Sequence, residues 1–171
     1  MFGGENGMIE GWDPRTKIQV SIKDITRDLA ISMRSINEPD CEISSIKFGN
    51  DGITLAVGTS TGHCLLYDIR SSLPIHVKDH QYGYPIKKIQ FQDKKIITSD
   101  KKIVKVWEAS ENTGKIFASI EPPADINDVT LVPNSGLFLF ACDQQKMTSY
   151  FIPELGPAPK WCAFLDNLTV Y

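Results

Sequence analysis

The chain has 171 residues, of which 42% are apolar and 23% are charged, and its formal net charge is −3. These values are ordinary for one soluble globular domain, and they give the chain as a whole no electrostatic preference for nucleic acid. No apolar run approaches the roughly 20 residues of a membrane span, and the first residues lack the basic and apolar regions of a secretory signal, so we expect an intracellular protein that contacts no membrane.

The first 42 residues predict two strands and then an interruption. Met8–Trp12 and Lys17–Ile22 have strand composition and are separated by the turn Asp13-Pro14-Arg15. Residues 23–42 contain apolar side chains at loosely helical spacing, namely Ile25, Leu29, Met33 and Ile36. We therefore predict an insertion over 23–42 that admits one short helix.

From residue 43 onward, the predicted strands come in sets of four, separated by Gly, Asn, Asp or Pro turns. The first set is Ile43–Phe48, Ile53–Thr59, Cys64–Ile69 and Ile75–Lys78. The second set is Pro85–Phe91, Lys95–Ser99, Ile103–Glu108 and Ile116–Ile120. The third set is Ile126–Leu131, Leu137–Cys142, Met147–Ile152 and Trp161–Leu165.

An aromatic residue marks the third strand of each set. Tyr67-Asp68 lies 40 residues before Trp107-Glu108, and Tyr150 follows 43 residues after Trp107. This period is typical of WD-type propeller blades, which repeat about every 40–45 residues. Trp12-Asp13 lies 55 residues before Tyr67, and the insertion accounts for the excess.

The pattern therefore predicts an all-β fold, a partial WD40-type β-propeller of about three and a half four-stranded blades. Residues 1–22 form the C-terminal half of a blade, because strands that should precede Met8 are missing, and residues 43–171 form three blades of the same propeller. Closed propellers have typically four to eight blades. We favour a piece of a longer protein over an arc that another copy or a partner completes.

WD-type blades are often held by a hydrogen-bonded set of histidine, serine, aspartate and tryptophan. In the middle blade His80, Ser99, Asp100 and Trp107 occur in that order, although Asp100 lies one residue farther from Trp107 than is usual. A buried indole N–H needs an acceptor, and such a set supplies one. We therefore predict that these residues form a structural network with no catalytic role.

Lysines are concentrated in the same blade, where the local net charge over residues 78–105 is +5. They are candidates for contact with a phosphate backbone or an acidic partner. The alternative is that they are solvated turn residues, and turns at opposite rims of the blade would not form one patch. The candidate lysines are Lys87, Lys88, Lys94, Lys95, Lys101, Lys102 and Lys105.

No catalytic, cofactor or metal site is predicted. The glycine-flanked run 58–62 lacks a phosphate-loop signature and predicts a hairpin turn. The four cysteines are scattered, with no metal-ligand spacing and no sign of a disulfide framework. A propeller hydrolase would need convergent acids or a nucleophile, which the sequence does not offer.

Several long stretches resemble the nucleolar protein 10 family, also described as essential nuclear protein 2-like, of eukaryotic WD-repeat proteins. The resemblance covers most of residues 43–169 and, before them, Glu10–Arg15. The stretches that carry it are Tyr67–Phe91 (YDIRSSLPIHVKDHQYGYPIKKIQF), Ile103–Trp107 (IVKVW), Gly114–Phe117 (GKIF), Asp125–Val129 (DINDV), Pro133–Leu137 (PNSGL) and Ile152–Thr169 (IPELGPAPKWCAFLDNLT).

The resemblance implies a non-enzymatic scaffold of the nucleus and nucleolus. It implies a role in the small-subunit processome, in pre-18S rRNA processing and small ribosomal subunit biogenesis. The partners it implies are other ribosome-assembly proteins, with direct contact to pre-rRNA left open, and no small-molecule substrate. An adaptor for another complex, such as a ubiquitin ligase, is the alternative.

Two connections are candidate partner-binding segments, because loops on a rigid scaffold often carry function. The first is His80-Gln81-Tyr82-Gly83-Tyr84-Pro85, in which His80 has the structural alternative given above. The second is the proline-rich run before Trp161, which either presents Trp161 to a partner or packs it beneath the blade.

Overall fold

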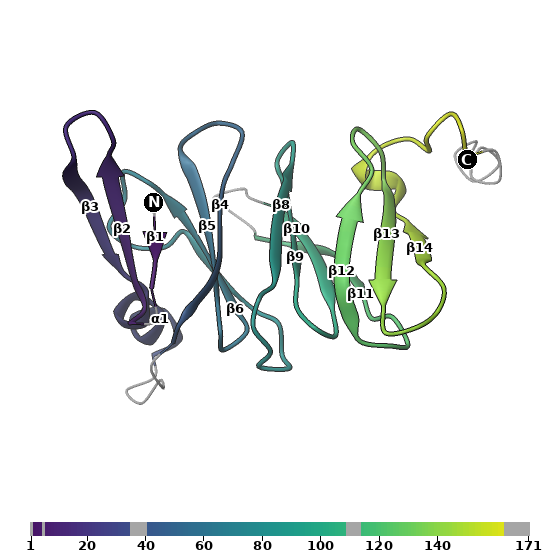
Figure 1. Ribbon diagram of the computed structural model, residues 1–171, viewed down its shortest axis with the longest axis horizontal. Helices are drawn as coiled ribbons and strands as arrows, with labels where there is room; N and C mark the ends of the chain where they lie inside the picture. Colours follow the sequence, from purple (N-terminus) through teal and green to yellow (C-terminus); the bar gives the residue numbers. More distant parts are fainter. Residues whose placement is uncertain (1, 5, 35–40, 109–113, 163–171) are drawn as a thin grey trace.

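The computed structural model describes residues 2–4, 6–34, 41–108 and 114–162 (Figure 1). Four antiparallel sheets stand side by side in chain order, from the purple N-terminal sheet to the yellow-green C-terminal one. This is the arrangement of consecutive propeller blades, and it confirms the predicted partial β-propeller. The described helices include none long and apolar enough to cross a membrane.

We number the sheets blade 1 to blade 4. Blade 1 has β1 (Phe2–Gly3), β2 (Met8–Asp13) and β3 (Ile18–Asp24), and α1 (Ile25–Met33) follows it. Blade 2 has β4 (Ile43–Phe48), β5 (Thr54–Thr59), β6 (His63–Asp68) and β7 (His76–Asp79). Blade 3 has β8 (Lys88–Gln92), β9 (Lys95–Ser99), β10 (Val104–Glu108) and β11 (Ile116–Ile120). Blade 4 has β12 (Ile126–Leu131), β13 (Leu137–Cys142), β14 (Thr148–Phe151) and the short 3-10 helix η1 (Pro153–Leu155).

Two predictions at the ends of the chain need correction. The region before Met8 is not without strands, because Phe2 and Gly3 pair with Glu10 and Ile9 as the short strand β1. In blade 4 the outer strand predicted at Trp161–Leu165 is wrong at its start. Trp161 and Cys162 lie in a turn, closed by a hydrogen bond from the Cys162 amide to the Pro159 carbonyl, and residues 163–165 lie outside the described part.

The core lies between the blades, because each inner sheet buries both of its faces. On one face of blade 3, Ile96 and Trp107 pack against Ala56, Cys64 and Leu66 of blade 2. On the other face, the alternate residues of β9 and β10 pack against blade 4; the cluster there includes Ile97, Val104, Val106, Phe138 and Phe140. Alternation along a strand therefore sends successive apolar residues into two different inter-blade layers.

The two rims of the array differ in the segments that form them (Figure 1). The turn rim holds the tight turns β4–β5 (residues 49–53), β8–β9 (93–94) and β12–β13 (132–136). The crossover rim holds the connections between blades 2 and 3 (80–87) and between blades 3 and 4 (121–125), together with the β9–β10 turn (100–103). As predicted, the two lysine pairs lie at opposite rims: Lys94 and Lys95 at the turn rim, and Lys101 and Lys102 at the crossover rim.

Helix α1 lies between the first two blades in the chain and is joined to blade 2 by a buried polar contact. Its N-cap is Asp24, whose side chain accepts a hydrogen bond from the Arg27 backbone N–H at 2.9 Å. Leu29 of the helix packs in the apolar layer between blades 1 and 2. The buried Asp28 carboxylate accepts a hydrogen bond from the Tyr67 hydroxyl of β6 at 3.0 Å. This contact fixes α1, which falls within the segment expected to hold one short helix, against blade 2.

We predict that Tyr67→Phe lowers the free energy of unfolding by about 1.5–3 kcal/mol, because the buried Asp28 carboxylate loses a hydrogen bond. The matched control is Tyr82→Phe, which also removes a hydroxyl bonded to a carboxylate, but on the exposed surface. Tyr82→Phe should change the free energy of unfolding by no more than about 0.5 kcal/mol. Urea unfolding of both variants is the measurement, and equal costs would contradict the anchoring role of the Asp28–Tyr67 contact.

Candidate functional site

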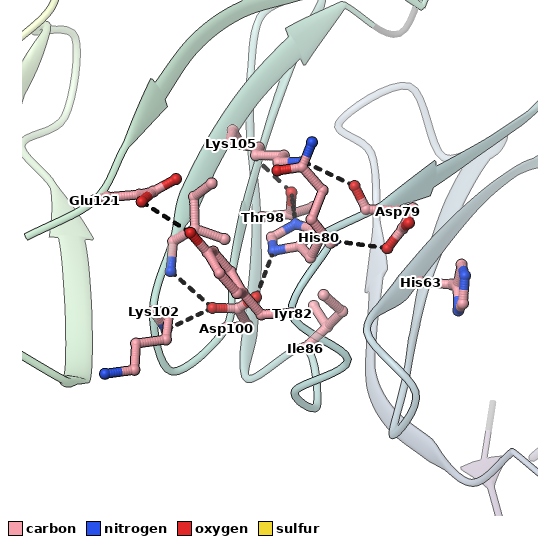
Figure 2. Close-up of polar contacts among 12 residues, drawn as sticks. His63, Asp79, His80, Tyr82, Ile86, Thr98, Asp100, Lys102, Lys105 and Glu121 are labelled. Atoms are coloured by element: carbon pink, nitrogen blue, oxygen red, sulfur yellow. Dashed lines mark hydrogen bonds and ion pairs between the residues drawn. The ribbon is translucent and has the colours of Figure 1, made fainter.

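A buried polar network supports the crossover rim of blade 3 (Figure 2). His80, in the connection that leaves β7, lies between Asp100 and Thr98: its Nδ1 is 3.1 Å from Asp100 Oδ2 and its Nε2 is 2.8 Å from Thr98 Oγ1. The indole N–H of Trp107 donates to Thr98 Oγ1 at 3.2 Å. All four side chains are almost completely buried, so the network joins the inter-blade connection to β9 and β10.

The partners assign the direction of these hydrogen bonds. Asp100 Oδ1 accepts the amides of Lys102 and Ile103 at 2.6 and 2.7 Å, as an ionised carboxylate does. A carboxylate can only accept, so Nδ1 of His80 is the donor to Asp100. Thr98 Oγ1 accepts the Trp107 N–H and is also hydrogen-bonded to His80 Nε2, so a continuous hydrogen-bonded chain joins Trp107, Thr98, His80 and Asp100. Through Asp100, the network holds the backbone of the β9–β10 turn.

The prediction that Ser99 belongs to this network is wrong, and the hydroxyl comes from Thr98. The cause is the two-residue period of a strand. Thr98 lies opposite Lys105, on the same face of the sheet as Ile96 and Trp107, whereas Ser99 lies opposite Val104 on the other face. Ser99 therefore cannot reach the indole of Trp107.

Above the network, the connection 81–85 displays aromatic side chains on the crossover rim. Tyr82 is 48% exposed and its hydroxyl donates to Glu121 at 3.0 Å, a contact that raises the pKa of Tyr82 (Figure 2). Tyr84 is 36% exposed, and the Lys101 ammonium lies 5.8 Å from its ring centroid. Gln81 and Gly83 have positive φ of 72° and 66°, so the backbone changes direction just before each tyrosine.

His80 was a candidate for partner contact as well as for the network, and the structure excludes the first role. Its side chain has no exposed surface, and both of its ring nitrogens are engaged inside the chain. The side chain of the neighbouring Gln81 is exposed. The backbone N–H of Gln81 donates to Asp79 Oδ1 at 2.7 Å. The candidate docking surface on this rim, called the tyrosine surface below, is therefore Gln81, Tyr82 and Tyr84 with the flanking side chains of Lys101 and Lys102.

The two lysines of the β9–β10 turn share one carboxylate of the next connection. Lys101 Nζ lies 2.8 Å from Asp125 Oδ2, and Lys102 forms an ion pair with Oδ1 of the same group. Hydrogen bonds from Lys101 and Lys102 lower the pKa of Asp125 to about 2. Because this pKa is lower in the folded state than its ordinary value of about 3.9, the ionised carboxylate stabilises the folded state at pH values above about 3.9. This stabilisation is lost as the pH falls through about 2. Both pairs are therefore formed at neutral pH, where one positive charge remains in excess.

Most other candidate lysines connect blade 3 to its neighbours. Lys87 Nζ donates to the Ile126 carbonyl at 2.9 Å, and Lys88 Nζ lies 2.8 Å from Asp128 Oδ1, both in blade 4. Lys105 is buried, its pKa is lowered by that burial, and its ammonium donates to the Asp79 carbonyl at 2.8 Å. The interpretation as solvated turn lysines is wrong for Lys105, which is buried, whereas Lys87 is exposed and Lys88 is partly exposed, although each also has a partner in blade 4.

The remaining candidates lie at the turn rim or near the end of the described chain. Lys94 is exposed in the β8–β9 turn, whereas Lys95 donates to the Glu154 carbonyl of η1. Trp161 is 69% exposed, so the interpretation that it packs beneath the blade is wrong. Its neighbour Cys162 turns inward and packs with Leu137, which leaves the indole on the outside.

Within the described ranges, no three His, Cys, Asp or Glu side chains come together in a way that could hold a metal ion. All four cysteines are buried, and burial raises the pKa of the Cys64 thiol to about 12. Such a thiol is not a nucleophile at neutral pH. The groups that the tyrosine surface exposes are aromatic rings and ammonium groups.

Residues 1–170 match the family described as "Nucleolar protein 10-like, N-terminal domain". "Nucleolar protein 10" of Homo sapiens is 52% identical over 169 residues, and "Ribosome biogenesis protein ENP2" of Saccharomyces cerevisiae is 42% identical over 172 residues. Each alignment covers 98% of this chain but only 24% and 23% of the relative. The chain thus spans about a quarter of the length of these relatives.

Solved structures with the same fold include a chain in the crystal structure of the mitotic checkpoint complex, with a TM-score of 0.70 at 18% identity. That alignment covers 90% of this chain and 46% of the other. The computationally designed Ika4 protein aligns with a TM-score of 0.66 at 14% identity, over 88% of this chain and 82% of the designed one. At such identities the likeness establishes the fold alone.

We predict that Thr98→Val lowers the free energy of unfolding by at least about 2 kcal/mol, because the buried Trp107 and His80 nitrogens each lose a partner worth about 1–3 kcal/mol. Ser99→Ala, one residue away and equally buried, is the control, with an expected cost below about 1 kcal/mol. Chemical denaturation measures both. A larger loss for Ser99→Ala than for Thr98→Val would restore Ser99 to the network.

Proposed function

This chain belongs to the nucleolar protein 10-like family, and from that membership we propose that it is a nucleolar docking module for ribosome assembly. Relatives of this chain in Saccharomyces cerevisiae and Schizosaccharomyces pombe are named as ribosome biogenesis proteins. The finer part of the proposal is that the module acts in the small-subunit processome and supports pre-18S rRNA processing. It does so without catalysis, by holding other assembly proteins.

The observation that carries the proposal is the tyrosine surface on the crossover rim. Exposed tyrosines are well suited to recognition, because they offer large contact area at a low cost in conformational entropy. Tyr82 and Tyr84 follow directly from the buried His80, whose hydrogen bonds fix the base of the connection. A preformed connection of this kind loses little entropy when a partner binds.

The charge distribution favours a protein partner over RNA at this surface. Lys101 and Lys102 stand beside Asp125, and Glu121 lies at the Tyr82 hydroxyl, so the positive charge is largely compensated. Nucleic-acid surfaces need uncompensated lysines or arginines that can replace counterions on phosphates. Lys87, Lys88 and Lys105 already serve contacts inside the chain. Contact with pre-rRNA is therefore the secondary part of the proposal.

We predict that the double change Tyr82→Ala and Tyr84→Ala, made in the whole protein as cells express it, weakens association with small-subunit precursors at least tenfold. Loss of two central aromatic contacts in an interface typically costs that much. The measurement is the share of the protein that sediments with precursor particles on a density gradient, together with the level of unprocessed pre-18S rRNA, which should rise.

The matched control replaces Ile53 and Leu73 by alanine, since both are exposed apolar side chains away from the crossover rim. This variant should sediment like the unchanged protein. If the tyrosine variant also stays with the particles, the tyrosine surface is not the docking site. Absence of the unchanged protein from the particles would refute the assembly role itself, and stable association with a ubiquitin ligase would favour the adaptor alternative.

A further inference from the structure

The exposed ring of Tyr82 is held by a carboxylate that belongs to the next inter-blade connection. Tyr82 lies in the connection between blades 2 and 3, and its hydroxyl donates to Glu121 Oε2 at 3.0 Å (Figure 2). Glu121 is the first residue of the connection between blades 3 and 4 and lies 39 residues farther along the chain. The contact therefore crosses the rim of blade 3 and joins two connections that are far apart in the sequence.

The connection that carries Glu121 has a restrained backbone. Glu121 is followed by Pro122 and Pro123, whose rings restrict the backbone φ, and Pro122 is buried. At the far end of the connection, the backbone N–H of Ile126 donates to the Lys101 carbonyl of the β9–β10 turn at 2.7 Å. The carboxylate of Glu121 is therefore presented from a segment that strand β11 fixes on one side and this hydrogen bond fixes on the other.

The backbone on both sides of Tyr82 is anchored as well. The backbone N–H of His80 donates to the Gly62 carbonyl at 3.0 Å, and that of Ile86 donates to the Thr59 carbonyl at 3.1 Å. The side chains of His80 and Ile86 are fully buried. On this anchored connection, the hydrogen bond of the Tyr82 hydroxyl restrains the rotation of a side chain that is otherwise exposed.

We propose that Glu121 is a positioning residue of the tyrosine surface, which orders the Tyr82 ring before a partner binds. Ordering one mobile side chain on binding weakens affinity by about twofold to tenfold, so a ring that is already held avoids that loss. Because the single hydroxyl proton of Tyr82 is donated to Glu121, the hydroxyl oxygen faces a partner as an acceptor. This role rests on the proposed docking function and adds Glu121 to the residues on which docking depends.

Two other roles for Glu121 lead to different expectations. As a direct contact, the exposed carboxylate would bind the partner itself, and its loss would add to the loss of the Tyr82 hydroxyl. As an incidental surface contact, it would contribute nothing measurable, as is common for exposed polar pairs. A positioning residue acts only through Tyr82, so its effect disappears once the hydroxyl is gone.

The test is a double-mutant cycle of Tyr82→Phe and Glu121→Ala in the whole protein as cells express it. Each variant is expressed beside a tagged unchanged copy, and the ratio of the two in the precursor-particle fraction of a density gradient gives the relative association. Each single change should lower this ratio about threefold, and the double change should lower it no further, because both changes remove the same hydrogen bond. Glu121→Gln keeps a carbonyl that can accept from the hydroxyl and should recover most of the loss.

Glu154→Ala is the matched control, because it removes an exposed carboxylate on η1, outside the tyrosine surface, and should leave the ratio unchanged. An unchanged ratio for Glu121→Ala, a loss that adds to that of Tyr82→Phe, or no recovery in Glu121→Gln would overturn the positioning role. A lowered unfolding midpoint that accounts for the loss would overturn it too. If the variant with alanine at both Tyr82 and Tyr84 associates normally, the docking surface itself fails; if that variant is lost from the particles while Glu121→Ala is retained, only the positioning role fails.

Discussion

Burial of apolar sheet faces between neighbouring blades is the constraint on which the rest of this structure depends. A single four-stranded sheet cannot bury both faces by itself, so each blade requires neighbours. Blade 3 shows this most clearly, since Ile96 and Trp107 face blade 2 while Ile97 and Val106 face blade 4. Where a neighbour is lacking, as on β3 of blade 1, Ile18, Val20 and Ile22 are exposed.

Polar contacts then fix how the stacked blades are aligned. Lys87 and Lys88 reach from blade 3 to blade 4, and the His80 network joins the blade 2–3 connection to the interior of blade 3. These contacts engage the ammonium groups of both lysines, and the charge of Lys88 is paired with that of Asp128. What remains exposed for recognition at the crossover rim is the tyrosine surface. A rigid array with functional loops at its rim is consistent with a docking role.

The fold could be predicted because its determinants are local and periodic. The 40- and 43-residue spacing of Tyr67, Trp107 and Tyr150, together with the turn residues, places the strands close to their observed bounds. Side-chain partners could not be predicted in the same way. The partners of Lys87 and Lys88 lie 39 and 40 residues along the chain, in another blade, and no local pattern announces such a pair.

The candidate site was predictable only in outline. Strand alternation, applied from Trp107 across the β9–β10 hairpin, would have selected Thr98 in place of Ser99. The exposure of Tyr82 and Tyr84 follows from their place in a connection, whereas the burial of His80 in the same segment depends on Asp100 and Thr98.

Residue-resolved hydrogen exchange under native conditions tests the stacking account most directly. If inter-blade burial holds the array together, the hydrogen-bonded amides of β9 and β10, covered on both sides, should exchange more slowly than those of β3 by a factor on the order of 100 or more. Uniform protection across the four blades, or slowest exchange in β3, would contradict it.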